Sequence, residues 1–374
     1  MSERLYATLG VGMERVVSRE LKALGIDVSR IEPGRARFEG TLDDIYRAII
    51  HLRCASRVVR ELHFVELVSE DDLYDAVRGV DWTRWMTADT TFRVHFNVHS
   101  SLLRNTRFGL YRIKDAICDQ VRDKTGGRPS VAQQSPQVYV TCYLENRRLS
   151  IGLDAAGEPL HMRGYRVAQH ETSLREHLAA AMVLQSGWER GVPLHDPFCG
   201  SATILTEAAM IATRTPPSHY RAQFGCMGWP DFDKARFEQL RQEAEAAVLG
   251  VEGLQVTGAD RDAKAVELAR QNVRSAGFEG VIGLEVRDVA QMRLPAGSFI
   301  VTNPPYGVRQ GERRDVEATW QSFRQAAMSC PGAHVTAIAA DEGFEKGFGL
   351  RPFKRNRMNN GPIRCVLAQY AIRS

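Results

Sequence analysis

Residues 299–307 read FIVTNPPYG, an apolar run with strand character that leads directly into asparagine, two prolines, an aromatic residue and a glycine. Each proline fixes φ and lacks a backbone N–H, so the corner is rigid and two carbonyl groups have no N–H beside them. Tyr306 then presents an aromatic ring, and Gly307 lets the chain turn away. A simple strand-to-loop turn is the alternative interpretation, and the surrounding sequence decides between the two.

Strand and helix patterns alternate from about residue 186 onward. PLHDPFCG and LQVTGAD have strand character, and each is followed by a helix-like stretch, SATILTEAAMIA or RDAKAVELARQNVRSAG. This alternation is typical of a parallel sheet with helical crossovers, and such open α/β sheets bind ligands at the carboxyl ends of their strands. The last strand pattern, CVLAQYAI, predicts an edge strand in an antiparallel hairpin.

Four of these strand ends carry residues suited to ligand binding: DPFCGSAT (196–203), Asp260, Asp288 and NPPY (303–306). Gly200 lets the backbone approach a ligand closely, just before a helix N-terminus. Asp260 is placed either to accept hydrogen bonds from ribose hydroxyls or to cap the following helix. Asp288 is placed either to accept from an adenine amino group or to cap a turn. The four features in this order are far more specific than any one of them.

On these motifs, residues 186–374 resemble a class I S-adenosylmethionine-dependent methyltransferase, and NPPY resembles the motif of enzymes that methylate exocyclic or planar nitrogens. The resemblance implies S-adenosylmethionine as the cofactor and no metal ion. The cofactor-binding residues that it implies are Asp196, Pro197, Cys199, Gly200, Ala202, Thr203, Asp260, Arg261, Asp288, Val289 and Asn303. The implied catalytic residues are Asn303, Pro304, Pro305 and Tyr306. A dehydrogenase is excluded because GxGxxG is absent and NPPY has no role in it.

The NPPY residues suit methylation of an amino group on a base. Such a nitrogen is a poor nucleophile because its lone pair is delocalised into the ring. The side-chain oxygen of Asn303 and the carbonyl of Pro304 can accept its two hydrogens and direct the lone pair at a sulfonium methyl group. The rate then comes from positioning and from fixed dipoles. Tyr306 would stack on the extruded base, a contact that contributes roughly 1–3 kcal/mol.

Position 202 departs from the usual DPFCGSGT or DPMCGSGT loop of these enzymes, because alanine stands where they have glycine. A negative φ at this position would make Ala202 harmless, whereas a positive φ would strain the loop. A methyl group here would also occupy space where glycine normally lets the cofactor approach. Ala202 is therefore the one observation that favours a non-catalytic, RNA-binding factor that kept the fold.

The first 165 residues resemble the ferredoxin-like lobe and the THUMP domain of RNA-modifying enzymes. Residues 1–67 show the order strand, helix, strand, helix, strand, and residues 68–165 form a second α/β unit with a long basic helix, RFGLYRIKDAICDQVRDKTG. A connector, 166–185, leads to the methyltransferase domain, 186–374. The predicted fold class is therefore α/β: a Rossmann-like class I methyltransferase domain preceded by a ferredoxin-like lobe and an α/β THUMP domain.

Basic residues are concentrated in two stretches. Residues 93–128 contain eight Lys or Arg against three acids, and residues 351–364 contain five basic residues and no acid, although the whole chain carries only +4. Such stripes are typical of phosphate binding, and a solvated charged face is the alternative. In the family this lobe holds structured RNA, so the resemblance implies RNA-binding residues Arg104, Arg107, Arg112, Lys114, Arg163 and Arg166.

Two further stretches indicate a more specific family. FGCMGW (224–229) and RMNNGPIRCVLAQY (357–370) are similar to the bacterial large-subunit rRNA guanine-N2 methyltransferase family. The expected activity is therefore methylation of guanine N2 in 23S rRNA. A related family with the same domains methylates guanine N2 in the tRNA acceptor stem and stays an alternative. Adenine-N6 and glutamine methyltransferases also use NPPY, but the THUMP-like lobe disfavours DNA and protein substrates.

Cysteine and hydropathy patterns indicate a cytoplasmic protein. Seven cysteines form no CxxC pair, which argues against a disulfide framework or a zinc site and suits a reducing compartment. The ten histidines show no metal-binding spacing. The N-terminus, MSERLYATLG, has no signal-peptide character, and no stretch approaches 18 apolar residues, so we expect no membrane span.

Overall fold

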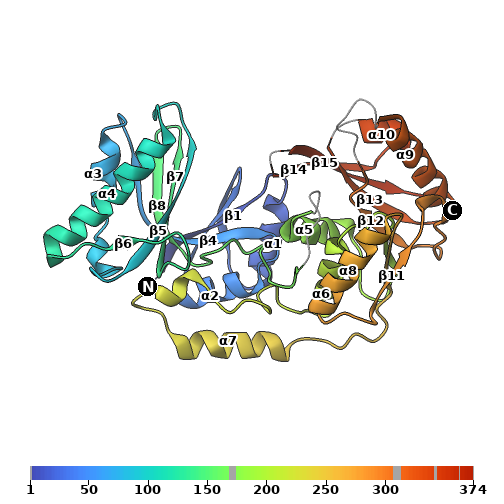
Figure 1. Ribbon diagram of the computed structural model, residues 1–374, viewed down its shortest axis with the longest axis horizontal. Coiled ribbons are helices and arrows are strands. Elements are labelled where there is room, and N and C mark those ends of the chain that lie inside the picture. Colours follow the sequence, from blue (N-terminus) through green and yellow to red (C-terminus); the bar gives the residue numbers. More distant parts are fainter. Residues whose placement is uncertain (1, 168–173, 306–312, 341–342, 362, 374) are drawn as a thin grey trace.

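The computed structural model describes residues 2–167, 174–305, 313–340, 343–361 and 363–373, and for residues 313 and 314 the backbone only. Within these ranges the chain forms two sheets that follow one another along the long axis of the molecule, the first from the N-terminal part and the second from the C-terminal part (Figure 1). No helix in these ranges is both long enough and apolar enough to cross a lipid bilayer.

The first sheet has eight strands in the order β2-β3-β1-β4-β8-β7-β5-β6. Their bounds are β1 Glu3–Leu9, β2 Val28–Glu32, β3 Arg35–Gly40, β4 Ala55–Glu66, β5 Thr91–His99, β6 Ser130–Val131, β7 Val138–Glu145 and β8 Arg148–Asp154. The helices are α1 Glu14–Ala23, α2 Leu42–His51, α3 Asp72–Arg78, the short 3-10 helix η1 Trp82–Arg84 and α4 Thr106–Thr125. β4 pairs antiparallel with β1 and with β8. The two predicted N-terminal units therefore share one continuous sheet, and the domain limits drawn from the sequence stay predictions.

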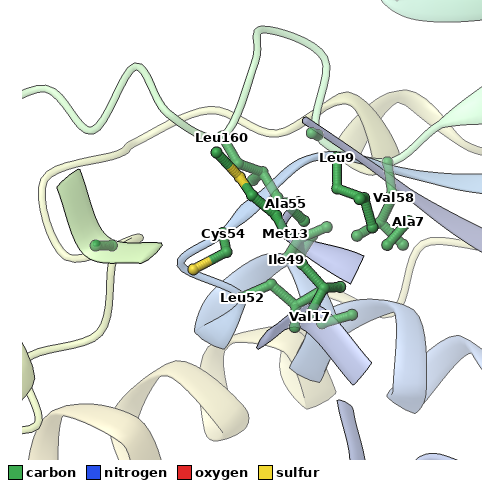
Figure 2. Packing of buried hydrophobic residues seen from close by; sticks show 14 of the residues in the cluster. Ala7, Leu9, Met13, Val17, Ile49, Leu52, Cys54, Ala55, Val58 and Leu160 are labelled. Atoms are coloured by element: carbon green, nitrogen blue, oxygen red, sulfur yellow. The ribbon is translucent and has the colours of Figure 1, made fainter. Parts of the chain in front are cut away.

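The core of the N-terminal lobe lies between β1 and β4 of this sheet and the helices α1 and α2. Figure 2 shows the side chains that fill it: Ala7, Leu9, Met13, Val17, Ile49, Leu52, Cys54, Ala55, Val58 and Leu160. All of them are buried. Leu160 follows β8, and its N–H donates to the carbonyl of Ser56 at 2.8 Å, so the chain leaving the first sheet is itself part of this core.

The second sheet has seven strands in the order β11-β10-β9-β12-β13-β15-β14. Their bounds are β9 Leu194–Asp196, β10 Val256–Asp260, β11 Ile282–Val286, β12 Phe299–Thr302, β13 His334–Ala339, β14 Lys354–Asn360 and β15 Ile363–Ala371. The first five in spatial order are parallel, and β15 is antiparallel to both its neighbours. The predicted hairpin is present, but β14 forms the edge and β15 lies inside, so the prediction of CVLAQYAI as the edge strand was wrong.

Helices cover both faces of the second sheet. Their bounds are α5 Glu176–Ser186, α6 Thr203–Ala212, α8 Ala263–Ser275, η3 Val289–Gln291, α9 Arg313–Met328 and α10 Gly343–Phe348. Two further elements, η2 Gly225–Gly228 and α7 Lys234–Ala246, belong to the insertion that packs on the N-terminal half. Val301 of β12 packs in the same core cluster as residues of α5 and α6, whereas Ile300 packs in a second cluster with Trp320 and Phe344 of α9 and α10. Alternate residues of a strand point to opposite faces, so β12 is covered from both sides.

The insertion between α6 and β10 connects this domain to the N-terminal half. Helix α7 lies alongside α2 (Figure 1), where Arg236 pairs with Asp43 at 2.6 Å. The FGCMGW stretch packs closely on the first sheet. A Cβ at Gly228 would lie 1.8 Å from the carbonyl oxygen of Gln137, and one at Gly225 would lie 2.3 Å from that of Asp154. These two glycines therefore allow a backbone contact that no larger residue could make.

A fully buried ion pair joins the two halves. Arg163 and Glu207, whose side chains are 0% exposed, meet at 3.2 Å. The guanidinium of Arg163 also donates to the carbonyl of Arg53 at 2.5 Å, and Arg53 in turn donates to the carbonyls of Met210 and Thr215 at 3.2 and 2.6 Å. The N-terminal lobe is thereby fixed to α6, the helix that follows the DPFCGSAT loop.

We expect Glu207→Gln to destabilise the protein strongly, because it leaves the charge of Arg163 buried without a counter-charge. Breaking such a pair from one side costs about 3–5 kcal/mol of unfolding free energy. Urea unfolding measures the change. The control is Glu279→Gln, which breaks the exposed pair with Arg274, and there we expect little effect. Equal effects of the two substitutions would contradict a structural role for the buried pair.

Candidate active site

Three neighbouring strands, β9, β10 and β12, end at one edge of the second sheet, and hydrogen bonds hold their carboxyl ends together. The hydroxyl of Thr302 donates to Asp196 at 2.6 Å, which joins β12 to β9. The N–H of Gly200 donates to Asp260 at 3.0 Å, which joins the DPFCGSAT loop to β10. The structure therefore brings Asp196, Gly200, Asp260 and the residues after Thr302 to one place, as the strand-end argument predicts.

Solvent reaches Gly200 and Asp260, which are half-buried, and Arg261 and Asp288, which are exposed; Phe198, Asn303 and Pro305 at the same edge are half-buried too. Gly200 has a φ of 50°, and no described atom lies within 4 Å of the point where a Cβ would stand, so the space beside it is open. Asp260 is not the cap of the next helix, because Asp262 takes that position and accepts from the N–H of Lys264. Asp288 caps η3 by accepting from the N–H of Ala290. The roles of Asp260 toward a ribose and of Asp288 toward an adenine stay predictions.

Other residues predicted to bind the cofactor lie inside the loop. Cys199 and Val289 are each 5% exposed, and Thr203 is 4% exposed. Pro197 is buried as well. Side chains that are covered to this extent support the loop and do not form its outer surface. Their role in cofactor binding stays a prediction.

Ala202 adopts the left-handed conformation, with φ 61° and ψ 26°. Its N–H donates to the carbonyl of Cys199, and it begins α6. A residue with a Cβ pays a strain of about 1–2 kcal/mol in this conformation. The residue is 0% exposed, so its methyl group points into the protein and not into the open space beside Gly200. The backbone at Ala202 therefore has the positive φ that strains the loop. Its methyl group, however, does not occupy the surface where a cofactor would lie.

Asp196 is the most perturbed acid of the site. Burial above all, and to a smaller extent the nearby carboxylate of Asp260, raise its pKa to about 7, while hydrogen bonds from the hydroxyl of Thr302 and the N–H of Phe198 act against this shift. Near neutral pH the carboxyl group therefore exchanges a proton, and its neutral form is favoured by the dry surroundings. Because it is 1% exposed, Asp196 acts on the site through the loop that it holds.

Asn303 and the prolines follow directly after β12. The side-chain oxygen of Asn303 is buried and accepts no hydrogen bond from any described residue. Trp320 of α9 donates its indole N–H to the carbonyl of Pro305 at 2.8 Å and so fixes the corner. Pro304 is buried, and Tyr306, the predicted stacking residue, lies outside the described residues. An unpartnered acceptor on a fixed corner is suited to receive a hydrogen from a substrate.

Two supporting residues were missed by sequence analysis. Trp320 is 5% exposed and stands edge-on to Phe344, which ties the proline corner to the core. Asn272 lies buried within α8, where its amide donates to the carbonyl of Ser201 at 3.1 Å and accepts from the N–H of Val167 at 3.0 Å. A buried asparagine in a helix interior is unusual and is the signal that could have identified it.

The predicted RNA-binding residues divide into two groups. Asn105 caps α4 by accepting from the N–H groups of Arg107 and Phe108. Arg104, just before the cap, and Arg107, Phe108 and Tyr111 in the first turns of the helix are exposed. Two of the predicted residues are partly engaged within the protein. Arg112 stacks on Tyr74 at 4.7 Å, and Lys114 pairs with Asp115 at 2.8 Å.

Arg163 is inside the protein, so the prediction that it binds RNA was wrong, whereas Arg166 is half-buried and its role in RNA binding stays a prediction. Arg163 forms the buried pair with Glu207. Arg166, whose side chain is 9% exposed, donates to the carbonyl of Leu174 and the hydroxyl of Thr203 and lies 3.5 Å from Glu176. Arg163 connects the two halves of the molecule, and an RNA strand on the surface could not reach it.

Comparison with known families agrees with this architecture. Residues 4–59 match the RlmL ferredoxin-like domain, residues 68–154 match the THUMP domain, and residues 163–369 match the RMKL-like methyltransferase domain.

Solved structures with the same fold cover nearly the whole chain. A methyltransferase candidate, SMU.472, in complex with SAH, shares 28% identity with a TM-score of 0.89, covering 99% of this chain and 98% of its own. A "possible methylase" from Clostridium difficile 630 shares 26% identity with a TM-score of 0.90, covering 100% and 99%. TrmN from Thermus thermophilus, at 20% identity and a TM-score of 0.72 with 100% coverage of both chains, shows the fold alone.

The fold and the strand-end residues define a class I methyltransferase that uses S-adenosylmethionine, with the domain combination of RNA-modifying enzymes. The chain belongs to the RMKL-like methyltransferase domain family. The predicted fold class and the predicted cofactor are thereby confirmed.

We expect Ala202→Gly to stabilise the protein, because glycine removes the strain of the left-handed conformation. Part of this gain is offset by the greater freedom of glycine in the unfolded chain, so the net increase in unfolding free energy should be about 0.5–1 kcal/mol. Urea unfolding measures it. Affinity for S-adenosylmethionine, measured by calorimetry, should stay unchanged because the methyl group points away from the site. A large gain in affinity would contradict that placement.

The raised pKa of Asp196 predicts a pH-dependent contribution to stability. Because the pKa of the folded protein lies above that of the unfolded chain, the contribution is present at low pH and is lost as the pH rises from about 4 to about 7. The unfolding free energy of the natural protein relative to Asp196→Asn should therefore fall between pH 5 and pH 7 and then stay level. Urea titrations at half-unit intervals measure this difference, and a constant value across the range would contradict the shift.

Proposed function

We propose that this protein transfers a methyl group from S-adenosylmethionine to the exocyclic N2 of a guanosine in structured RNA, with 23S rRNA as the favoured substrate. The observation that carries the proposal is the buried side-chain oxygen of Asn303 on the proline corner, which accepts a hydrogen bond from none of the residues that the structure describes. A buried acceptor without a donor is rare in folded proteins and calls for a ligand that supplies one.

The amino group of guanine supplies that donor. Its two hydrogens would be accepted by the side-chain oxygen of Asn303 and the carbonyl of Pro304. When bound, S-adenosylmethionine would supply the electrophilic methyl group by cleavage of its S–CH3 bond, and the methylated nitrogen would then lose one of its two hydrogens as a proton to water. The chain contributes position and fixed dipoles: Thr302 is tied to Asp196 before the corner, and Trp320 holds Pro305 after it. These two hydrogen bonds hold the backbone on both sides of Asn303.

The surface of α4 supports RNA as the substrate. Arg104 and Arg107 present exposed cations, and Phe108 and Tyr111, which are 51% and 47% exposed, present aromatic rings beside them. The guanidinium of Arg107 and the ammonium of Lys114 both lie over the ring of Tyr111, at 5.9 and 5.5 Å. Cations bind phosphates and exposed rings stack on unpaired bases, so this helix end suits a single-stranded or distorted region of RNA.

The choice of guanine N2 and of 23S rRNA rests on sequence resemblance. FGCMGW and RMNNGPIRCVLAQY are similar to the large-subunit rRNA guanine-N2 methyltransferases. The match to the RlmL ferredoxin-like domain supports the same choice of substrate. The tRNA acceptor stem is the alternative substrate. The strained backbone at Ala202 leaves a non-catalytic RNA-binding factor as a second alternative, whereas its buried methyl group, which leaves the open edge clear, supports an active enzyme.

The deciding experiment is methyl transfer from labelled S-adenosylmethionine to protein-free 23S rRNA and, separately, to total tRNA, both from cells that lack this gene. Each product is digested to nucleosides. We expect N2-methylguanosine in the rRNA. The same nucleoside in tRNA alone would indicate that the substrate is the tRNA acceptor stem. N6-methyladenosine in either RNA would refute guanine as the target.

Asn303→Ala should lower the transfer rate on the order of 100- to 1,000-fold, the cost of removing one fixed dipole from such a site. Binding of S-adenosylmethionine should persist, because the proposed partner of this side chain is the base. Single-turnover transfer and calorimetric cofactor titration measure the two effects. The matched control is Asn97→Ala on the exposed surface of β5. Full activity of Asn303→Ala would refute the proposed role.

A further inference from the structure

A second polar pocket lies between the C-terminal hairpin and α10. It has a volume of about 440 Å³ and is lined by Glu345 and Lys346 of α10, Arg355 and Arg357 of β14, and Val366 of β15. None of these residues belongs to the strand-end site described above.

The charges of the pocket are arranged in a definite way. Glu345, whose side chain is 18% exposed, is held by the guanidinium of Arg355 through bonds of 2.6 and 2.9 Å. This pairing neutralises the one acid of the lining and leaves Lys346 and Arg357 exposed, with no ion pair to any described residue. Asp341 and Glu342 precede α10 in the sequence and lie outside the described residues. The described lining thus presents two available cations to one open space, which suits a phosphate group.

Strand register places this pocket level with the proposed catalytic corner. Thr302 pairs with Ala337, Ala339 pairs with Val366, and Val366 pairs with Arg357. Arg357 therefore lies two residues nearer the carboxyl edge than Thr302, at the level where Asn303 and Pro304 leave β12. Three strand spacings separate β12 from β14, a distance of roughly 14 Å. A phosphate in the pocket would thus be a short stretch of chain away from a base held at Asn303.

The hairpin is a rigid support for such a contact. On one side, a Cβ at Gly12 would lie 2.0 Å from the carbonyl oxygen of Arg357, so the turn of the N-terminal lobe packs directly against β14. Asn356 donates to the side chain of Gln185 in α5, which fixes the same strand to the body of the domain. Arg364 is exposed and lies two residues before Val366 on β15, so it extends the basic surface on the same face of the hairpin. In Figure 1 the hairpin stands between the two halves of the molecule.

We propose that this pocket binds a backbone phosphate of the RNA, close along the strand to the nucleotide presented to Asn303. The proposal rests on the proposed RNA methylation and adds a second anchor to it. The end of α4 holds the body of the RNA, whereas the pocket fixes the strand on the other side of the extruded base. Phosphate contacts of this kind set register and carry no base specificity.

The test is the double variant Lys346→Gln/Arg357→Gln, compared with Lys234→Gln/Arg241→Gln on α7. The control makes the same chemical changes on the opposite side of the molecule (Figure 1). RNA affinity is measured by filter binding at several salt concentrations. Loss of one phosphate contact should lower the slope of log K against log salt by about 0.7–0.9 and weaken binding roughly tenfold at moderate salt. The control should keep the slope of the natural protein.

A second measurement locates the contact. Ethylation of RNA phosphates near the methylated guanosine should interfere with binding of the natural protein and of the control, and this interference should disappear in the pocket variant. Cofactor affinity should be the same in all three proteins.

The outcomes separate the two proposals. If the natural protein methylates RNA but the pocket variant keeps its slope and its interference pattern, the pocket inference is refuted while the function stands. If the natural protein binds no RNA, both are refuted. If the pocket variant binds inorganic phosphate less well than the natural protein but binds RNA equally well, the pocket binds free anions and not RNA. This outcome would also refute the inference.

Discussion

The buried pair of Arg163 and Glu207 is the contact on which the arrangement of the molecule depends. Two charges out of water are expensive, and their mutual attraction compensates only when the geometry is fixed. Here the same guanidinium also holds the carbonyl of Arg53, and Arg53 reaches the end of α6. Any rotation of the N-terminal lobe against the methyltransferase domain would separate these groups and leave a charge buried alone. The pair therefore sets one distance between the surface of α4 and the corner at Asn303, and RNA must fit that distance.

The continuous eight-stranded sheet has a similar effect within the N-terminal half. Because β4 is hydrogen-bonded to both β1 and β8, the ferredoxin-like and THUMP regions move together. The FGCMGW glycines then bring the insertion into backbone contact with β8 and the start of β7. If α4 faces the RNA as proposed, it is carried by this continuous sheet, and extrusion of the target base would have to come from the RNA. This requirement favours loops and strand ends, where unpairing costs least.

Features that depend on the order of strands were predictable from the sequence, and features that depend on distant partners were not. A parallel sheet brings its carboxyl ends together, so the alternating pattern alone was enough to assign the motifs at Gly200, Asp260 and Asn303 to one edge. An arginine can be buried only when the fold supplies a counter-charge. For Arg163 this counter-charge is Glu207, which lies 44 residues away in the sequence. The backbone angle of Ala202 stayed open for the same reason: glycine at that position in relatives suggests a positive φ, but only the fold determines where the methyl group points.

The unpartnered oxygen of Asn303 has a further consequence for catalysis on the proposed reaction. Leaving a buried acceptor unsatisfied costs about 1–3 kcal/mol in the free protein. It persists because the residues on both sides are fixed, by Asp196 through Thr302 and by Trp320 through Pro305. As a new N–C bond forms, the nitrogen becomes positive and its hydrogens become stronger donors. A hydrogen bond to Asn303 is then stronger in the transition state than in the bound substrate. An interaction of this kind raises the rate of the reaction and not only the affinity for the substrate.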